Sequence, residues 1–263
     1  MRRETFETPG PLLLNVRMPS GRIELEAVAG SETVVELDAN PEIEEETRIE
    51  IRPKGEGHEV SVILDKRFGF FRGFRGDVRV RISAPPGADV DVSTASADLE
   101  GRGAFGAIEV NSASGDVEFE RVSGDAGVNS ASGDIKISRV EGGLTVNTAS
   151  GDVEVGHLGQ NGKVRSASGD VSIEEAAASL KIQTASGDLE VGSVTEGDVT
   201  LQTASGDIQV GVKKGSKLWI DARSMSGDTS SELDVGDAPP EGQGPLVEVR
   251  ATAMSGDIRV KRA

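Results

Sequence analysis

The chain has 263 residues and a formal net charge of −17, from 45 Asp and Glu against 28 Lys and Arg. This charge disfavours nucleic acid and anionic lipid as partners, because binding either requires Lys and Arg to meet the negative surface. Cysteine is absent, which excludes disulfides, and aromatic residues make up only 3% of the chain. Such a composition favours a slender core of small and β-branched side chains.

The N-terminal residues contain one short apolar run, at positions 12–14. A membrane span requires about 20 apolar residues, and a signal-peptide core is also longer than this run. We therefore expect no signal peptide or transmembrane segment, and a cytoplasmic location unless a partner holds the chain at the envelope.

Residues 1–85 have the alternation of apolar and polar residues that is typical of β-strands. The segments are RIELEAV, TVVELDA, TRIEIRP, HEVSVIL and DVRVRIS, and turns rich in Gly and Pro join them. The stretch MPSGRIEL resembles a degenerate copy of the repeat described below. We predict an irregular N-terminal β cap over residues 1–85, which covers strand edges that would otherwise be exposed.

A cluster of aromatic and basic residues, KRFGFFRGFRG, occupies positions 66–76 of this otherwise acidic chain. It could contact a protein partner or a membrane surface, or its Phe side chains could plug the open end of the fold. Nucleic acid is not expected. The candidate partner-binding residues are Arg67, Phe68, Phe70, Phe71, Arg72, Phe74 and Arg75.

Residues 86–263 are dominated by a repeated SASGD motif. Its aspartates recur every 18 residues from Asp98 to Asp188, and then at intervals of 19, 21 and 29 up to Asp257. The positions on both sides of the motif alternate between apolar and polar, which predicts two short strands per repeat. The fold prediction is therefore all-β: a single-stranded β-solenoid with about 18 residues per rung, as one elongated domain over residues 1–263. The cross-section could have two faces or three.

Each position of the motif has an expected structural role. Glycine supplies the positive φ of a tight bend, while Ser and Asp side chains cap turn N–H groups. The alanine becomes Met225 and Met254 in the last two copies, so we expect this position to pack inward. An acidic loop is expected at about residues 229–243. The charged tail at 259–262 is expected to protect the end of the solenoid. End protection favours a monomer, with self-association as the alternative.

The repeat φ-x-[ST]-A-S-G-D-φ-x-φ and the segment from Val78 to Val92 resemble the bacterial putative-adhesin family of β-strand-repeat proteins. The resemblance covers roughly residues 75–263. It implies a right-handed β-solenoid-like module, often tied to the cell envelope, without assigned catalytic residues.

The residues offer little for catalysis. Only two histidines, His58 and His157, are available as bases, and Cys and Tyr are absent. A repeated Ser-Gly-Asp has no base to activate its serine, and an even ladder of carboxylates lacks the asymmetry of an acid–base pair. We therefore expect no enzyme and no cofactor.

Stacked aspartates about 4.8 Å apart repel one another by roughly 1 kcal/mol per neighbouring pair in a water-like dielectric. Turn donors and salt could offset this repulsion, or calcium could bridge successive corners. The calcium candidates are Asp116, Asp134, Asp152, Asp170, Asp188 and Asp207.

Together these features predict a non-catalytic, adhesin-like scaffold that binds a protein or envelope partner. The alternatives are a calcium-binding solenoid and a self-assembling scaffold with the architecture of bactofilins.

Overall fold

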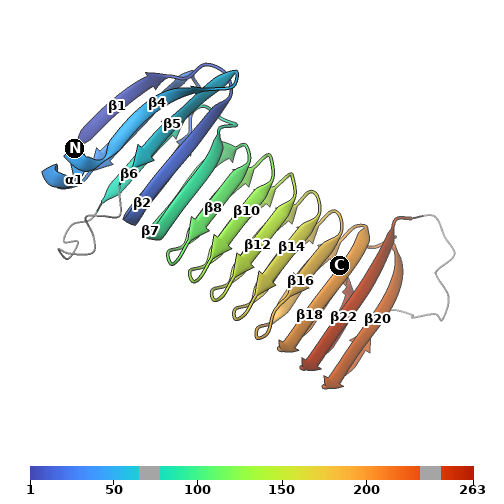
Figure 1. Ribbon diagram of the computed structural model, residues 1–263. Helices are drawn as coiled ribbons and strands as arrows, with labels where there is room; N and C mark the ends of the chain where they lie inside the picture. Colours follow the sequence, from blue (N-terminus) through green and yellow to red (C-terminus); the bar gives the residue numbers. More distant parts are fainter. Residues whose placement is uncertain (65–77, 232–243) are drawn as a thin grey trace. The chain divides into compact units, whose positions relative to one another are not determined.

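The computed structural model describes residues 1–64, 78–231 and 244–263, which form two compact units, residues 1–133 (unit 1) and 134–263 (unit 2). Apart from one short helix, the regular elements are β-strands (Figure 1). In unit 1 they are β1 (Arg2–Glu7), β2 (Leu12–Ala27), β3 (Glu32–Asp38), α1 (Pro41–Glu46), β4 (Arg48–Lys54), β5 (Gly57–Ile63), β6 (Arg79–Ala84), β7 (Asp89–Phe105), β8 (Ile108–Ser112), β9 (Val117–Val122) and β10 (Ala126–Ser130).

The described elements of unit 2 are strands throughout. They are β11 (Ile135–Val140), β12 (Leu144–Thr148), β13 (Val153–Leu158), β14 (Gly162–Ser166), β15 (Val171–Ala176), β16 (Leu180–Gln183), β17 (Leu189–Val194), β18 (Gly197–Ser205), β19 (Ile208–Val212), β20 (Lys217–Ser226), β21 (Thr229–Ser231), β22 (Leu246–Ser255) and β23 (Ile258–Arg262).

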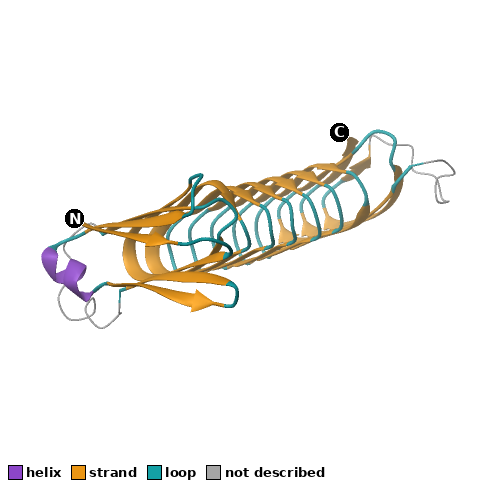
Figure 2. Ribbon diagram, turned by 90° about the horizontal axis from the view of Figure 1, so that it is seen from above, coloured by secondary structure: helices purple, strands orange, loops and turns teal. Residues whose placement is uncertain are grey.

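Unit 2 is built from coils that stack in parallel. Strands β12, β14, β16 and β18 form one stack and β11, β13, β15, β17 and β19 form the other, with most partners 18 residues apart. Each coil therefore contributes one strand to each of two layers, and turns connect the two layers (Figure 2). The predicted β-solenoid with about 18 residues per rung is confirmed, and its cross-section here has two faces.

The predicted apolar columns form the core between the two layers. Ile137, Val155 and Ile173 follow one another through three coils, and all are fully buried. Identical positions stack because a parallel register places each side chain directly over its counterpart in the previous coil. The core is thus as narrow as the composition indicated.

In unit 1 the parallel coil begins at β2, within the range expected to be the cap. β2 lies in register with β7, so that Ser20 faces Ser96 and Gly21 faces Ala97, as the resemblance of MPSGRIEL to the repeat indicated. On its other side β2 pairs in parallel with β5 and then with β6. The pairs β4–β5, β3–β6 and β1–β3 are antiparallel and lie beyond this first coil.

The first copy of the motif departs from the others, because Ala97 replaces glycine. No described residue other than glycine has a positive φ, so Ala97 does not adopt the left-handed conformation. Strand β7 continues through this corner instead, and Ala97 is buried. The strain that a left-handed alanine would carry is therefore absent.

The last coils of unit 2 do not follow the order of the chain. β22 lies between β18 and β20, and β23 lies between β19 and β21. The expectation that the charged tail protects the end is therefore wrong, because β23, which contains all of that tail, belongs to the last coil but one. The first residues of the expected acidic loop, Thr229–Ser231, form β21, and residues 232–243 lie outside the described residues.

The corner glycines generate a testable prediction. Gly169 has φ of +119°, and a Cβ placed there would lie 2.2 Å from the carbonyl oxygen of Gly151 in the preceding coil. Gly215 also has a positive φ, of +91°, but a Cβ there would meet no atom within 4 Å. We expect Gly215→Ala to cost about 1–2 kcal/mol of unfolding free energy from backbone strain, and Gly169→Ala about 1–3 kcal/mol more from the clash. Denaturant unfolding of both variants measures the difference, and equal losses would mean that coil contact does not restrict this corner.

Candidate functional site

The repeated aspartates form a ladder of hydrogen bonds from coil to coil. In unit 2 the Oδ1 atom of every repeated aspartate except Asp228 accepts the backbone N–H of the aspartate in the neighbouring coil. In unit 2 the donor–acceptor distances are 2.9 Å from Asp152 N to Asp134, 2.8 Å from Asp170 N to Asp152, 2.8 Å from Asp188 N to Asp170 and 2.7 Å from Asp207 N to Asp188. The ladder continues through Asp257 and Asp228, each at 2.8 Å. We conclude that these carboxylates fasten adjacent coils together, whereas the sequence suggested caps within a single turn.

The hydroxyl residue at the first position of the motif caps its own turn. The hydroxyl groups of Thr148, Ser166 and Thr184 each donate to the carbonyl oxygen two residues later, at 2.8–3.0 Å. The predicted role in turn formation holds, but the hydroxyl satisfies a carbonyl group rather than an N–H group.

The alanine of the motif faces solvent, so the expected inward packing is wrong. Ala149 and Ala167 are exposed, and their counterparts Met225 and Met254 have exposed fractions of 83% and 56%. The alternation of the preceding strand explains the outward direction, because the residue before each alanine points inward, with Thr148 buried and Ser166 half-buried. Replacement by methionine therefore reflects tolerance at the surface.

The calcium candidates remain a prediction. The five candidates from Asp134 to Asp207 each have an Oδ1 atom that accepts an N–H group from the neighbouring coil. No cluster of three or more His, Asp or Glu with metal-holding geometry occurs in residues 1–64, 78–231 and 244–263. Acidic residues of unit 2 also line a cavity of about 220 Å³, next to Asp188, Glu190, Asp207 and Asp257. Arg259 also lines it and supplies positive charge of its own.

Among the described residues, neither histidine forms a hydrogen bond with a serine or threonine that could act as a nucleophile. His157 Nδ1 lies 3.2 Å from the Glu175 carboxylate, which belongs to the next coil at the register position opposite. This is a ladder contact between outward-facing side chains on the surface of β13 and β15.

The outward face of β3, β6, β2 and β7 in unit 1 carries alternating charges. Arg81 on β6 lies between two carboxylates, with its Nε atom 3.0 Å from Glu24 Oε2 and its Nη1 atom 3.4 Å from Glu36 Oε2. The hydrogen bond to Glu24 and its charge raise the pKa of Arg81. On β7, Arg102 Nε donates to Glu100 Oε1 at 2.6 Å, and this contact raises the pKa of Arg102. We call this surface the charged face.

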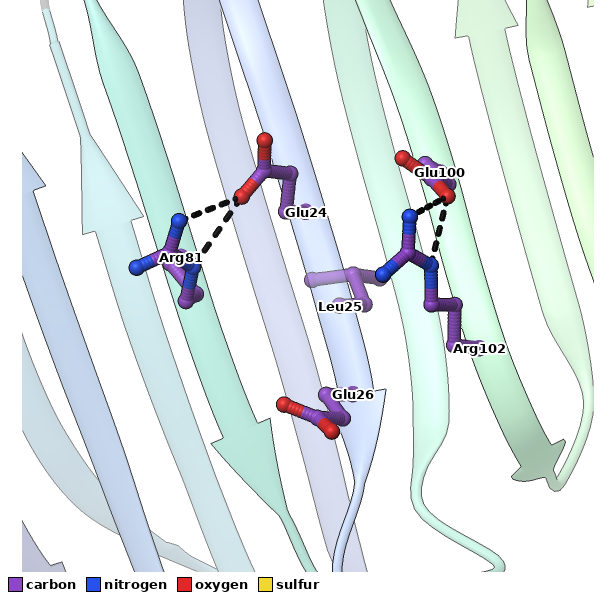
Figure 3. Close-up of a pocket in the computed structure, with 6 residues that line it drawn as sticks. All are labelled: Glu24, Leu25, Glu26, Arg81, Glu100 and Arg102. Atoms are coloured by element: carbon purple, nitrogen blue, oxygen red, sulfur yellow. Dashed lines mark hydrogen bonds and ion pairs between the residues drawn. The ribbon is translucent and has the colours of Figure 1, made fainter.

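A shallow cavity of about 430 Å³ lies in the charged face. Its lining residues are Glu24, Leu25, Glu26, Arg81, Glu100 and Arg102 (Figure 3). Glu26 is exposed and stands opposite Arg102 in the β2–β7 register. Carboxylates and guanidinium groups are therefore held side by side by three adjacent strands, and the cavity offers both charges to a polar ligand.

Sequence reasoning missed the charged face, although its residues were visible. The outward positions of RIELEAV and DVRVRIS are Glu and Arg, which marks polar strand faces but not which strands are neighbours. The residues that were predicted to bind a partner, Arg67 to Arg75, lie outside the described residues. The described residues next to them, Leu64 and Val78, are buried and bond to the backbone of β2.

The chain was compared with known families, curated proteins and solved structures. Residues 78–261 match the family model described as Toastrack DUF4097. No curated protein matches the chain. Two solved structures that it resembles are putative adhesins from Parabacteroides merdae (TM-score 0.48, 10% identity, 98% of this chain and 95% of the other) and Parabacteroides distasonis (TM-score 0.46, 10% identity, 98% and 96%). A third, described as a putative lipid binding protein from Parabacteroides distasonis, has a TM-score of 0.40 at 12% identity over 98% and 96% of the chains.

The aspartate ladder predicts different effects for two substitutions at one position. Asp170→Ala removes the acceptor for the Asp188 N–H group and should lower the free energy of unfolding by about 1 kcal/mol. Asp170→Asn retains an oxygen acceptor and removes a negative charge, so we expect a smaller loss. Urea titration of both variants tests this, and losses of equal size would show that the hydrogen bond is not the stabilising feature.

Calcium is tested by the thermal midpoint of the purified protein in excess EDTA and in millimolar calcium. Because the ladder already provides donors for the described carboxylates, we expect equal midpoints. A rise of many degrees in calcium would instead identify the aspartate column as a metal site. Magnesium at the same concentration is the control for a general effect of divalent ions on an acidic protein.

Proposed function

The chain belongs to the Toastrack DUF4097 family, and we propose that it is a non-catalytic, adhesin-like scaffold that binds a protein or cell-envelope partner through the charged face of unit 1. The observation that carries the proposal is the cavity of this face, where Glu24, Glu26, Arg81 and Arg102 present both charges at fixed spacing. The sequence predicts a cytoplasmic location, so we expect contact with the envelope to depend on this partner.

The proposed absence of catalysis is supported by how the chain uses its reactive groups. The repeated carboxylates bind backbone N–H groups and the repeated hydroxyls bind carbonyl groups. Acid–base catalysis requires groups with distinct environments and separated pKa values, and the ladder gives each aspartate nearly the same surroundings.

The charged face is suited to binding because its side chains are held in place before a partner arrives. Glu24, Arg81 and Glu36 occupy neighbouring positions on three paired strands, so their spacing is fixed by the sheet register. A partner that meets preorganised charges loses less entropy on binding than one that meets free side chains. Arg102, with 72% of its side chain exposed, is accessible at the edge of the cavity.

The proposal is tested by cosedimentation of the purified protein with isolated bacterial envelopes. We expect binding to fall at least about tenfold for Glu26→Lys with Arg102→Glu, because the charge pattern is reversed at two adjacent positions while the net charge is kept. Binding should also weaken between 0.05 M and 0.5 M salt, since exposed charges are screened. The thermal midpoint should change little.

Lys181→Glu on β16 is the matched control, because it reverses an exposed charge on a coil of unit 2. Equal binding by the double variant and the native protein would reject the charged face. In that case the variants Phe71→Ser and Phe74→Ser, which lie outside the described residues, test the aromatic cluster as the binding segment. A loss of stability in those variants would support the plug.

A further inference from the structure

We propose that β20 is the contact strand of a two-fold dimer, in which the β20 strands of two copies of this chain pair antiparallel at the open end of unit 2. This inference concerns a surface distant in sequence from the charged face and does not depend on the proposed function. It follows from the exchanged order of the last coils, which places β20 and β21 outermost.

The outer edge of β20 lacks a neighbouring strand among the described residues. Among the described strands, β20 pairs with β22 alone, from Lys217 opposite Leu246 to Ser226 opposite Ser255. Figure 1 shows β20 beyond β22 in this stack. A ten-residue parallel edge has backbone N–H and C=O groups pointing away from the sheet, and such an edge is a template for a further strand.

The described residues also leave the core only partly covered at this end. The inward positions of β20 are Leu218, Ile220 and Ala222, and each is only half-buried. Their register partners in β22, Val247, Val249 and Ala251, are fully buried. The difference arises because β22 has a coil on both sides and β20 has one, so another layer would remove further apolar surface from water.

Exposed apolar side chains gather on the same two strands. Six large apolar residues of the described chain are exposed, and four of them are Trp219 and Met225 on β20 with Leu246 and Met254 on β22. Trp219 is 36% exposed and has the Arg250 guanidinium 5.2 Å from its ring centroid. Tryptophan, methionine and arginine are enriched in protein interfaces.

The local charge permits association in spite of the acidic chain. The terminal coils, residues 217–231 and 246–262, contain six Lys and Arg and four Asp and Glu, whereas the whole chain has 28 against 45. Two copies that meet here therefore bring together surfaces without the acidic excess of the rest of the protein.

The sequence of β20 is complementary to itself in one antiparallel register. If the two-fold axis passes through Ala222, Asp221 of each copy faces Arg223 of the other, and Trp219 faces Met225. Both are favourable cross-strand pairs, one between opposite charges and one between sulfur and an aromatic ring. Within one copy Arg223 Nε already lies 3.0 Å from Asp221 Oδ1, so the dimer would form a four-charge cluster. An isologous contact uses the edge of both copies, and association stops at two.

The test uses charge reversal at the two facing positions. In Asp221→Arg every cross-strand charge pair becomes Arg facing Arg, and in Arg223→Asp it becomes Asp facing Asp. Sedimentation velocity over a range of concentrations should show a dimer for the native protein and a dissociation constant at least about tenfold higher for each variant. An equimolar mixture of the two variants should recover the dimer, because Arg at 221 and 223 in one copy then faces Asp at 223 and 221 in the other.

Arg165→Asp, which reverses an exposed charge on the inner coil strand β14, is the control and should dimerise as the native protein does. Thermal melts of every variant confirm that the coils remain folded. The proposal is overturned if the native protein stays monomeric at all concentrations, or if the mixed variants do not associate. It is also overturned if the amides of β20 that point away from β22 are protected from hydrogen exchange equally above and below the dissociation constant, because the edge would then be covered within one chain.

Discussion

The parallel hydrogen bonding of one coil to the next, in a register offset by one repeat, is the constraint on which the rest of the structure depends. Bonds such as Val153 N to Asp170 O and Val171 N to Asp188 O, both 2.9 Å, tie each corner to the following one. Once this register is set, every residue lies over the same position of the preceding coil. The side chains at equivalent positions must then pack against one another from coil to coil, which is why the core columns hold Val, Ile and Leu. For the same reason, the corner glycines of the motif lie so close to the preceding coil that no space remains for a side chain.

The same stacking explains the unusual position of the aspartates. Carboxylates held one coil apart repel one another, yet each accepts a hydrogen bond from the neighbouring backbone N–H group. A hydrogen bond to a charged acceptor is stronger than one between neutral groups, and salt screens the remaining repulsion at the exposed corner. The repeated motif is therefore an architectural device, and the surfaces that we propose for binding lie where the repeat is broken.

The sequence was sufficient to predict features that depend on local pattern. The strands, the apolar columns such as Ile137 and Val155, the positive φ of the corner glycines and the 18-residue coil all follow from alternation and period. The direction of Ala149 was misjudged, because the replacement by methionine was taken as evidence of burial although exposed sites also accept it. The neighbours of β22 and β23 could not be predicted, since all copies share one pattern and any of them can pair with any other in register. For the same reason the contact between Arg81 and Glu24 was not foreseen, as it requires knowing that β6 lies next to β2.

The exchanged order of the last coils affects how the chain can be assembled. Residues 246–262 are synthesised after residues 217–231, yet they form the coil that lies between residues 217–231 and the earlier coils. The earlier coils of unit 2 can be added one at a time as the chain emerges from the ribosome, but β20 and β21 have no completed layer to rest on until β22 and β23 are made. The coil of β20 and β21 can consequently reach its final position only after residues 246–262 have been made, and loss of those residues would remove the support of a segment that precedes them in the chain.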